Sequence, residues 1–350
     1  MKTAVIAITR NGARLGAKVQ HGLAGSTLFV ARKYAGAAGG ATVYDGELKA
    51  LVARLWPEVG GFVFIMATGI VVRLIAPLLR AKDTDPAVVV MDDAGNFAIS
   101  LLSGHLGGAN ELASRCAFVT GAREVITTAT DVNGLPSFDL LAKEEGWEIE
   151  DLGRVKVLNS LLLDGARIAV VDPSGRVRTA FRGRGVLTFH ETFLEALESG
   201  AAGFLFVTNR QLPPQSRSDR LLVLRPRNLV LGIGCNSGTS GEEIGEVVRS
   251  DLKRLFLSPK SIRCVATAEA KRHEPGLIAF AETLGVPLVC YGSGELNSVA
   301  VPSPPSVHAL AAIGAAGVAE PAALLASEGG TLLLKKIRSG NVTLAIAETG

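Results

Sequence analysis

Apolar runs of strand length alternate with segments of helical spacing through the first part of the chain. Residues 3–9 and 27–31 have the apolar continuity of buried strands, and helical spacing follows each, up to about Leu23 and over residues 46–56. This alternation is typical of βα units that build a mainly parallel sheet with helices on both faces. We therefore predict an α/β fold for this region.

The pattern is densest between residues 62 and 116. Three further runs of strand type occupy residues 62–67, 87–91 and 97–102. The polar turn DDAGN separates the last two runs, which predicts that the third strand returns beside the second.

Two glycine-bearing polar turns follow strands of this stretch, and each leads into a helix. Thr68 and Gly69 follow the first strand, with Arg73 one helical turn further on, and the turn SGHLGGANE (residues 103–111) follows the third. Glycine lets the backbone approach a ligand, and an open α/β sheet commonly binds its ligand at such turns. We expect these turns to form the floor of the active site, with the binding residues Thr68, Gly69, Arg73, Ser103, Gly104, Gly107, Gly108 and Asn110.

The rest of the chain divides by texture. Residues 1–135 form the N-terminal α/β domain, residues 136–227 a small α/β middle domain with little visible chemistry, and residues 228–350 a C-terminal α/β domain. The segment 209–220 is the most loop-like of the chain, and residues 311–327 are expected to be mostly helical. The overall prediction is a multi-domain α/β protein with mainly parallel sheets in its two outer domains.

The third domain opens on a strand that ends in the turn GIGCNSGTS (residues 232–240). Ser240 and Glu243 have the spacing of a capping box, in which each side chain binds a backbone N–H of the other residue. The glycine spacing is neither that of a dinucleotide fingerprint nor that of a phosphate loop. An anion site and a purely structural turn are equally good interpretations.

Composition limits the classes of partner. The chain has 350 residues, of which 48% are hydrophobic and 20% charged, as in soluble globular proteins of two or three domains. The net charge of +3 is spread along the chain without a run of five basic residues, which disfavours nucleic acid and is compatible with a small polyanionic ligand. Residues 60–79 contain Arg73 and Pro77, so a strand and an amphipathic helix fit them better than a membrane span.

The cysteines indicate a reducing compartment. Cys116, Cys235, Cys264 and Cys290 show no C-x-x-C spacing, and each lies in or beside an apolar run. Reduced thiols in a cytoplasmic protein follow from this pattern. No cluster of histidine, cysteine and carboxylate residues has the spacing of a metal site.

His105 is the best candidate for moving protons near neutral pH. It is the only histidine in a glycine-rich turn between a strand and a helix, although a structural hydrogen bond is an equally available role for it. No nucleophile elbow is present, which disfavours covalent serine catalysis. Carboxylates such as Glu111 and Asp131 flank turns of the first domain, where most such groups only satisfy backbone amides.

Two clusters of motifs stand out in the outer domains. The first domain contains ATGIVVR (residues 67–73) and SGHLGGAN (103–110), and the third contains GIGCNSGTSGEEI (232–244), ATAEAKRHEPGL (266–277) and SGNVTLAIAE (339–348). Together these motifs resemble the CbiG family, the cobalt-precorrin-5A hydrolases of cobalamin biosynthesis. The resemblance spans nearly the whole chain, and the two clusters occur in the order typical of the family.

The resemblance implies a step in the anaerobic route to vitamin B12. Water opens the δ-lactone of cobalt-precorrin-5A, and C20 leaves with its methyl group as acetaldehyde, giving cobalt-precorrin-5B. The acyl carbon must receive water, the oxyanion must be stabilised and a proton must be moved. The implied enzyme has no cofactor of its own, since cobalt arrives inside the substrate.

Residue roles follow from the resemblance and the position of each residue in a turn. His105 is the expected proton carrier, Glu111 or Asp131 orients it or the water, and amides of residues 104–108 receive the oxyanion. The substrate carboxylates are expected at basic side chains and at amides of the third-domain turn, which gives the binding candidates Arg73, Lys82, Lys271, Gly234, Thr239 and Ser240.

Two other functions stay open on the sequence. The same turns would serve a non-catalytic carrier of corrinoid intermediates, and the turn at Gly234 would serve a nucleotide- or sugar-phosphate-binding enzyme. In each case the partner is a small molecule rather than nucleic acid or membrane. Hand-over contacts with neighbouring enzymes of the pathway and a homo-oligomer are compatible with these interpretations.

Overall fold

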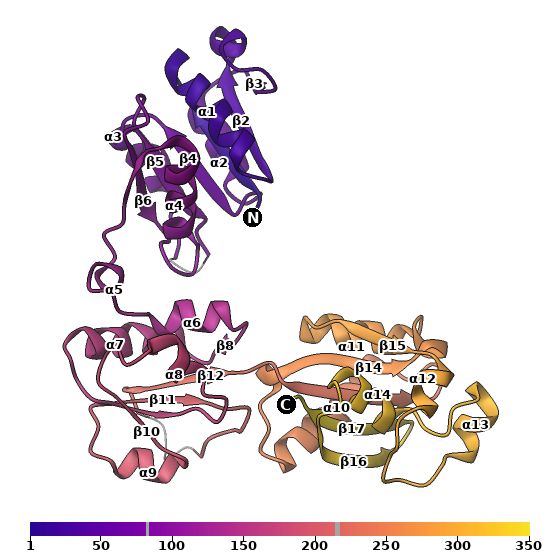
Figure 1. Ribbon diagram of the computed structural model, residues 1–350. Coiled ribbons are helices and arrows are strands. Elements are labelled where there is room, and N and C mark those ends of the chain that lie inside the picture. Colours follow the sequence, from indigo (N-terminus) through magenta and orange to yellow (C-terminus); the bar gives the residue numbers. More distant parts are fainter. Residues whose placement is uncertain (82–83, 214–217) are drawn as a thin grey trace. The chain divides into compact units, whose positions relative to one another are not determined.

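The computed structural model describes residues 1–81, 84–213 and 218–350, which form the units Met1–Leu140 and Leu141–Gly350. In the first unit the sheet has the order β3-β2-β1-β4-β5-β6-β7 (Figure 1). Its strands are β1 (Thr3–Ala7), β2 (Ser26–Ala31), β3 (Thr42–Tyr44), β4 (Gly61–Ile65), β5 (Ala87–Met91), β6 (Phe97–Leu102) and β7 (Arg123–Val125). Its helices are α1 (Arg10–Gly22), α2 (Leu48–Leu55), α3 (Thr68–Ile75), α4 (Ala109–Thr120), α5 (Ala129–Val132) and α6 (Phe138–Glu144), and α6 continues into the second unit.

Helices cover both faces of this sheet, as predicted. Every residue of β1, β4 and β5 is buried, which explains why these strands are continuous apolar runs rather than alternating ones. Side chains of α1 and α4 pack on one face, and those of α2 and α3 pack on the other. The predicted α/β class is confirmed by this layered arrangement.

The direction of β6 decides which turns can meet. Strands β1 to β5 run parallel, and β6 pairs antiparallel with β5, with Leu102 opposite Val88. The turn after β6 therefore lies at the amino ends of the parallel strands. Thr68 and Gly69 begin α3 at the carboxyl ends, at the other edge of the sheet, and Figure 1 shows α3 and α5 at opposite ends of it.

The second unit contains two sheets. The middle sheet has the order β10-β9-β11-β12-β8 and the last sheet the order β15-β14-β13-β17-β16. The middle sheet is built from β8 (Glu148–Ile149), β9 (Ile168–Val171), β10 (Leu187–Phe189), β11 (Gly203–Val207) and β12 (Leu221–Arg225), with α7 (Leu152–Leu163), α8 (Arg176–Phe181) and α9 (Phe193–Glu198). The last sheet is built from β13 (Leu229–Cys235), β14 (Ile262–Ala268), β15 (Leu288–Tyr291), β16 (Thr331–Ser339) and β17 (Val342–Glu348), with α10 (Gly241–Arg254), α11 (Pro275–Leu284), α12 (Ser293–Asn297), α13 (Val307–Ile313) and α14 (Ala319–Ala326).

Close packing of the backbone fixes two glycines around the last sheet, one in a strand and one in a helix. A Cβ on Gly232 would lie 1.9 Å from the carbonyl oxygen of Ala319, so α14 can pack on β13 only with glycine at this position. A Cβ on Gly276 would lie 2.0 Å from the carbonyl oxygen of Thr239, which brings the start of α11 against the turn before α10. The glycine turn and α11 thus form one packed assembly.

Two local predictions concern the second unit. Residues 311–327 are mostly helical, as predicted, but they belong to two helices, because Gly314 adopts a left-handed conformation at the end of α13 and α14 begins only at Ala319. The loop-like segment 209–220 is described only in part, since residues 214–217 lie outside the described residues.

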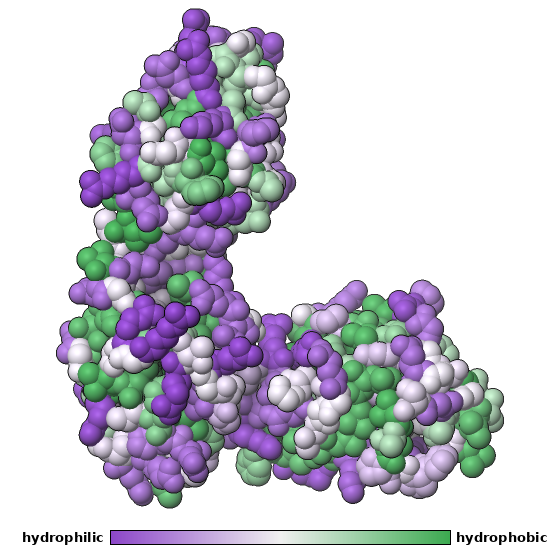
Figure 2. All heavy atoms as spheres, viewed as in Figure 1, coloured by the Kyte–Doolittle hydropathy of each residue, from purple (hydrophilic) through white to green (hydrophobic). Residues whose placement is uncertain are grey.

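Hydrophobic residues lie among hydrophilic ones on the visible surface (Figure 2). Phe118 and Val307 are the most exposed of the large hydrophobic side chains, and some exposed hydrophobic residues are normal on a protein surface. In the part of the chain that the structure describes, no helix is both long and apolar enough to span a membrane.

Candidate functional site

The turn between β6 and α4 is tight and specific in conformation. Ser103 has a positive φ of 58°, although it is not a glycine, and Gly108 precedes α4 with a φ of 88°. Backbone bonds close the turn, from the N–H of Ala109 to the oxygen of Ser103 at 3.0 Å and from that of Asn110 to the oxygen of Gly104 at 3.1 Å. A Cβ on Gly107 would lie 2.3 Å from the Cβ of Ser103, so the turn excludes a side chain there.

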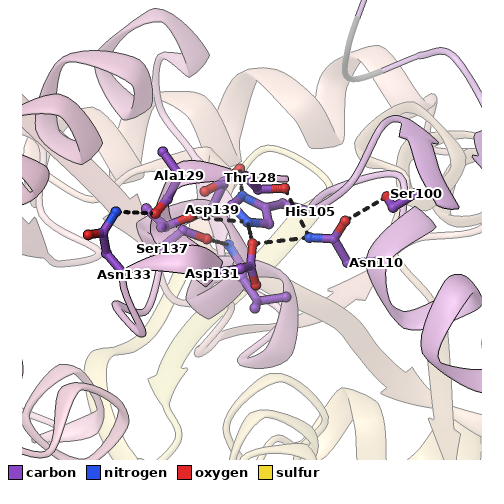
Figure 3. A network of polar contacts seen from close by, with 11 residues as sticks. Ser100, His105, Asn110, Thr128, Ala129, Asp131, Asn133, Ser137 and Asp139 are labelled. Carbon is purple, nitrogen blue, oxygen red and sulfur yellow. Dashed lines mark hydrogen bonds and ion pairs between the residues drawn. The ribbon is translucent and has the colours of Figure 1, made fainter. Parts of the chain in front are cut away.

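His105 projects from this turn between two carboxylates (Figure 3). Its Nε2 lies 2.8 Å from Oδ2 of Asp131 in α5, and its Nδ1 lies 3.5 Å from Oδ2 of Asp139 in α6. The hydroxyl of Thr130 is 3.3 Å from the same Nε2. The side chains of His105 and Asp139 are only 11% and 8% exposed, whereas that of Asp131 is 34% exposed. Solvent or a ligand can thus reach the His105 ring from the side of Asp131.

This geometry favours the doubly protonated ring. A carboxylate only accepts hydrogen bonds, so an imidazole that faces one carboxylate with each nitrogen needs an N–H on both. The hydrogen bond with Asp139 raises the pKa of His105 above its ordinary value of 6.5, burial of the ring opposes this, and the bond with Asp131 adds to the rise. His105 is therefore suited to donate a proton near neutral pH.

Asn110 anchors Asp131 from the first turn of α4. Its Nδ2 donates to Oδ2 of Asp131 at 3.1 Å and to the hydroxyl of Thr128 at 3.2 Å. Ser100 in β6 donates its hydroxyl to Oδ1 of Asn110 at 2.7 Å, which fixes the orientation of the amide (Figure 3). The residues around His105 are thus held by the end of the sheet and by the start of α4.

Backbone donors of the turn are only partly available for an oxyanion. The N–H of Gly108 donates to the oxygen of His105 at 3.0 Å, so this N–H is already used within the turn, and contact of Gly108 with substrate stays a prediction. Among the described residues, the N–H groups of Gly104, Leu106 and Gly107 have no acceptor. The buried hydroxyl of Ser103 likewise has no partner within the described residues. Unpaired donors beside a strained residue are typical of a ligand site.

Other predicted residues lie away from His105. Glu111 is in the same first turn as Asn110 but is exposed, and the ring nitrogens of His105 face Asp131 and Asp139 instead. Thr68, Gly69 and Arg73 lie at the other edge of the sheet, because β6 is antiparallel to its neighbour β5, and the expectation of one shared floor is wrong. Arg73 donates to the oxygen of Gly69 at 2.9 Å, and Lys82 lies outside the described residues.

The turn of the last sheet already holds a carboxylate. Glu274 accepts from the N–H of Gly238 at 2.7 Å and from the ammonium of Lys271 at 3.0 Å, and Lys271 also donates to Ser237. The backbone N–H of Gly238 and the Lys271 ammonium lower the pKa of Glu274. A substrate carboxylate would have to compete with Glu274 for the amide of Gly238 and for Lys271.

The start of α10 is capped in a different way from the predicted one. The hydroxyl of Ser240 accepts from the N–H of Glu243 at 3.1 Å, as a capping box requires. The Glu243 side chain turns instead to Asn341 in the hairpin between β16 and β17, where it accepts from the backbone N–H at 3.1 Å. Thr239 is buried and donates its hydroxyl to the oxygen of Asn236. Gly234 lies inside β13, opposite Thr343 of β17, and the turn follows it. This turn and the turn with His105 belong to different units, so their sharing one cleft stays a prediction.

Asp139 is the site residue that sequence reasoning missed. It lies in the first turn of α6, where an acidic residue is expected to stabilise the helix end, and this role hides any other. It also follows residue 135, where the first domain was predicted to end.

The four cysteines are free, and burial raises the pKa of Cys116 to about 12. Within the described residues no group of three or more histidine, cysteine or acidic residues is arranged to hold a metal ion.

Comparisons with known proteins cover nearly the whole chain. Residues 50–131 match the family model described as cobalamin synthesis G N-terminal, residues 136–226 the cobalamin biosynthesis central region, and residues 229–347 the cobalamin synthesis G C-terminus. A cobalt-precorrin-5A hydrolase of Priestia megaterium is 37% identical over 98% of this chain and 94% of its own length. One of Salmonella typhimurium is 32% identical over 87% of this chain and 86% of its own.

A solved structure is also similar. It is a homolog of cobalamin biosynthesis protein G from Sulfolobus solfataricus, is 23% identical, and covers 99% of this chain and 97% of its own, with a TM-score of 0.38. That score is too low to compare the two structures as wholes. The turn with His105 and Asp131 falls inside the first matched range, and Asp139 falls inside the second.

Proposed function

The chain belongs to the cobalamin synthesis G family, and we propose that it hydrolyses cobalt-precorrin-5A in the biosynthesis of cobalamin. Water opens the δ-lactone of the substrate, and C20 leaves with its methyl group as acetaldehyde, giving cobalt-precorrin-5B. The full-length similarity to relatives that bear the name of this hydrolase supports the proposal. The observation that carries the location of the site is the placement of His105 between Asp131 and Asp139.

The reaction sets two demands on the site. Addition of water to the acyl carbon gives the new carboxylate its oxygen, and the departing alkoxide oxygen takes a proton. Cleavage of the bond to C20 then turns this hydroxyl into the carbonyl of acetaldehyde, while the macrocycle carbon takes a proton. The net change is one water consumed and one acetaldehyde released, so the site needs a proton donor and stabilisation of an oxyanion.

His105 supplies the proton in this proposal. Asp131 and Asp139 hold the ring as an imidazolium, and Asp131 lies on the more exposed side, from which the substrate approaches. The N–H groups of Gly104, Leu106 and Gly107 are the donors for the oxyanion. Ser103 and Asn110 complete the group: Ser103 offers its unpaired hydroxyl, and Asn110 keeps Asp131 in place. Glu111, Thr68, Gly69 and Arg73 have no part in it.

The remaining assignments follow from the same reaction. The enzyme uses no cofactor of its own, because the cobalt belongs to the substrate. It works in the cytoplasm on a small corrinoid, and it meets the neighbouring enzymes of the pathway only to pass on labile intermediates. Its four cysteines stay reduced in that compartment.

Acetaldehyde release tests this proposal. Purified protein is incubated with cobalt-precorrin-5A, and acetaldehyde is measured by coupled reduction to ethanol. Wild-type protein should release it, and His105→Gln should lower the rate by about 10²–10⁴-fold, the usual contribution of a general acid or base. Glu111→Gln removes a carboxylate from the same helix start and should leave the rate unchanged. Binding of substrate by wild-type protein without acetaldehyde would show a carrier instead.

A further inference from the structure

A cavity of about 970 Å³ lies in the unit Leu141–Gly350, where the middle and last sheets meet. Its walls come largely from residues that directly follow parallel strands of the middle sheet. Asp172 and Arg176 follow β9, Phe193 follows β10, and Asn209 and Arg210 follow β11. The cavity therefore lies outside the carboxyl ends of these strands.

The topology of the middle sheet makes this position significant. Strand β9 pairs in parallel with β10 on one side and with β11 on the other. The chain moves from β9 outward to β10 and then across to β11, so the strand order reverses beside β9. Open α/β sheets bind their ligands at such a reversal, outside the carboxyl ends of the strands. The cavity occupies the binding position that this topology predicts.

The turn after β9 argues against a nucleotide as the occupant. In nucleotide-binding folds of this topology, backbone amides of the first turn receive a phosphate. Here Asp172 already accepts from the N–H of Ser174 at 3.1 Å and from that of Val177 at 2.7 Å. A phosphate at this turn would meet the carboxylate of Asp172. An anionic ligand must instead be held by side chains.

Arginines provide those side chains. Arg176, Arg210, Arg227 and Arg263 line the cavity, together with the acidic residues Glu145, Asp172, Glu191 and Glu348. Arg176 forms an ion pair with Glu145 at 3.7 Å, and among the described residues its guanidinium donates no hydrogen bond. Arg227 uses one nitrogen for Glu148 at 3.1 Å. A guanidinium carries five N–H donors in a fork that matches a carboxylate, so both residues keep donors for a ligand.

The floor of the cavity is polar and fixed. Asn209 is 5% exposed and donates to Oδ1 of Asn228 at 3.0 Å and to Oε1 of Glu348 at 2.7 Å. Asn228 donates to the same carboxylate oxygen at 2.8 Å, which ties the middle sheet to the last one. Trp147 and Phe193 also line the cavity, and the ring of Phe193 packs against that of Phe206 at 4.8 Å. Bonded amides, aromatic residues and arginines with donors to spare suit a large flat molecule with carboxylates at its rim.

We propose that this cavity binds a polycarboxylated tetrapyrrole, with Arg176 and Arg227 holding carboxylates at its edge. The volume is at the upper end of the ~300–1,000 Å³ range of ligand sites, which fits a macrocycle better than a single anion. The inference rests on the proposed function, because a corrinoid is the substrate class of that reaction. It assigns to the middle domain the role of holding the macrocycle.

Tryptophan fluorescence tests this site, because the chain has only two tryptophans. Trp147 lines the cavity and Trp56 lies in the other unit, so Trp56→Phe leaves Trp147 as the reporter. The probe is cobyrinic acid, a cobalt corrin with free carboxylates that absorbs where tryptophan emits. Cobinamide, with amidated side chains, and ATP serve as comparison ligands.

Cobyrinic acid should quench Trp147 in a saturable way, and cobinamide and ATP should not. In the Trp56→Phe protein, the double substitution Arg176→Gln with Arg227→Gln should raise the Kd for cobyrinic acid, measured by quenching, at least about tenfold. This is the loss expected from one charged hydrogen bond. Arg182→Gln with Arg220→Gln changes the charge equally at exposed positions outside the cavity and should have no effect. Equal affinity for cobinamide, quenching by ATP, or an unchanged Kd in the cavity variant would each overturn the inference.

Failure of this inference and of the proposed function can be told apart. His105→Gln should quench like the parent protein while releasing little acetaldehyde. If wild-type protein releases acetaldehyde and the cavity variant keeps its KM and quenching, the cavity has another role and the proposed reaction stands. If cobyrinic acid quenches as expected and wild-type protein releases no acetaldehyde, the binding site stands and the reaction does not.

Discussion

Asp139→Asn separates the charge of this residue from its size and from its place in α6. The substitution keeps a group of the same shape near Nδ1 of His105, at the 3.5 Å position that the carboxylate occupies, and removes the negative charge. Asp139 raises the pKa of His105 more than any other group. With the amide in its place, the imidazolium loses its strongest partner, and Asp131 is left as the remaining carboxylate.

The magnitude follows from the burial of the pair. A hydrogen bond to a charged group stabilises a protein by about 1.5–3 kcal/mol, and the 8% exposed Asp139 is little screened by water. Asp131 beside the ring is 34% exposed, so solvent compensates part of the loss and about 1–2 kcal/mol is expected. For a unit of this size this corresponds to a fall in Tm of roughly 4–8 °C.

The effect has a definite pH dependence. The pKa of His105 is raised in the folded protein, so its contribution to stability is complete below the unfolded value of 6.5 and is lost as pH rises through the folded value. The difference in Tm between wild type and Asp139→Asn should be large at pH 6 and small at pH 9. The loss of a negative charge from the start of α6 does not vary over this range.

Trp56 reports the unfolding of this unit, because it lies in it and stacks on Phe62 at 5.3 Å. The measurement uses a Trp147→Phe background and follows Trp56 emission during thermal unfolding between pH 6 and pH 9. Glu111→Gln makes the same chemical change at an exposed position and should show no such dependence. A difference between wild type and Asp139→Asn that is equal at both ends of the range would refute the charged pair.

Three further substitutions test the structure elsewhere. Gly107→Ala should reduce acetaldehyde release at least about tenfold, since its Cβ would lie 2.3 Å from that of Ser103 and displacing the turn costs about 1–3 kcal/mol; Gly294→Ala, with open space around it, is the control for the rate. Gly232→Ala should lower Tm or prevent folding, because the Cβ would lie 1.9 Å from the oxygen of Ala319, and an unchanged Tm would show that α14 does not pack as described. Glu274→Gln should lower Tm at pH 7, and the difference should shrink as pH falls below 4.5 through the lowered pKa of Glu274; a constant difference would contradict its pairing with Lys271 and the amide of Gly238.

Local patterns in the sequence predict much of the first unit. The runs at 62–67 and 87–91 are apolar throughout because β4 and β5 are buried on both faces. The DDAGN turn predicts the returning strand, and β6 does pair antiparallel with β5. The consequence for the site follows from these strand directions: the turn after β6 lies at the amino ends of the parallel strands, whereas Thr68 and Gly69 lie at the carboxyl ends. The predicted shared floor treated each strand and its turn separately and did not combine the two directions.

The candidate site shows the same limit. The glycine-rich turn marks His105, and acidic residues near turns include Asp131, which the structure places 2.8 Å from the ring. The contact between His105 and Asp139 joins residues 34 positions apart across a predicted domain boundary. Nothing in the sequence around Asp139, at the start of α6, indicates this contact. Likewise, the carboxylate of Glu274 fills the turn at Gly238 because α11 packs against it through Gly276. Long-range packing decides which groups of a turn stay available.

The pH dependence of kcat/KM for acetaldehyde release tests most directly whether His105, held between Asp131 and Asp139, donates the proton. If the imidazolium is the acid, kcat/KM is highest at low pH and falls as pH rises through the raised pKa of His105, above 6.5, and Asp139→Asn moves this fall to lower pH. A rate that rises through the same range, or a fall that Asp139→Asn leaves in place, would contradict the assignment.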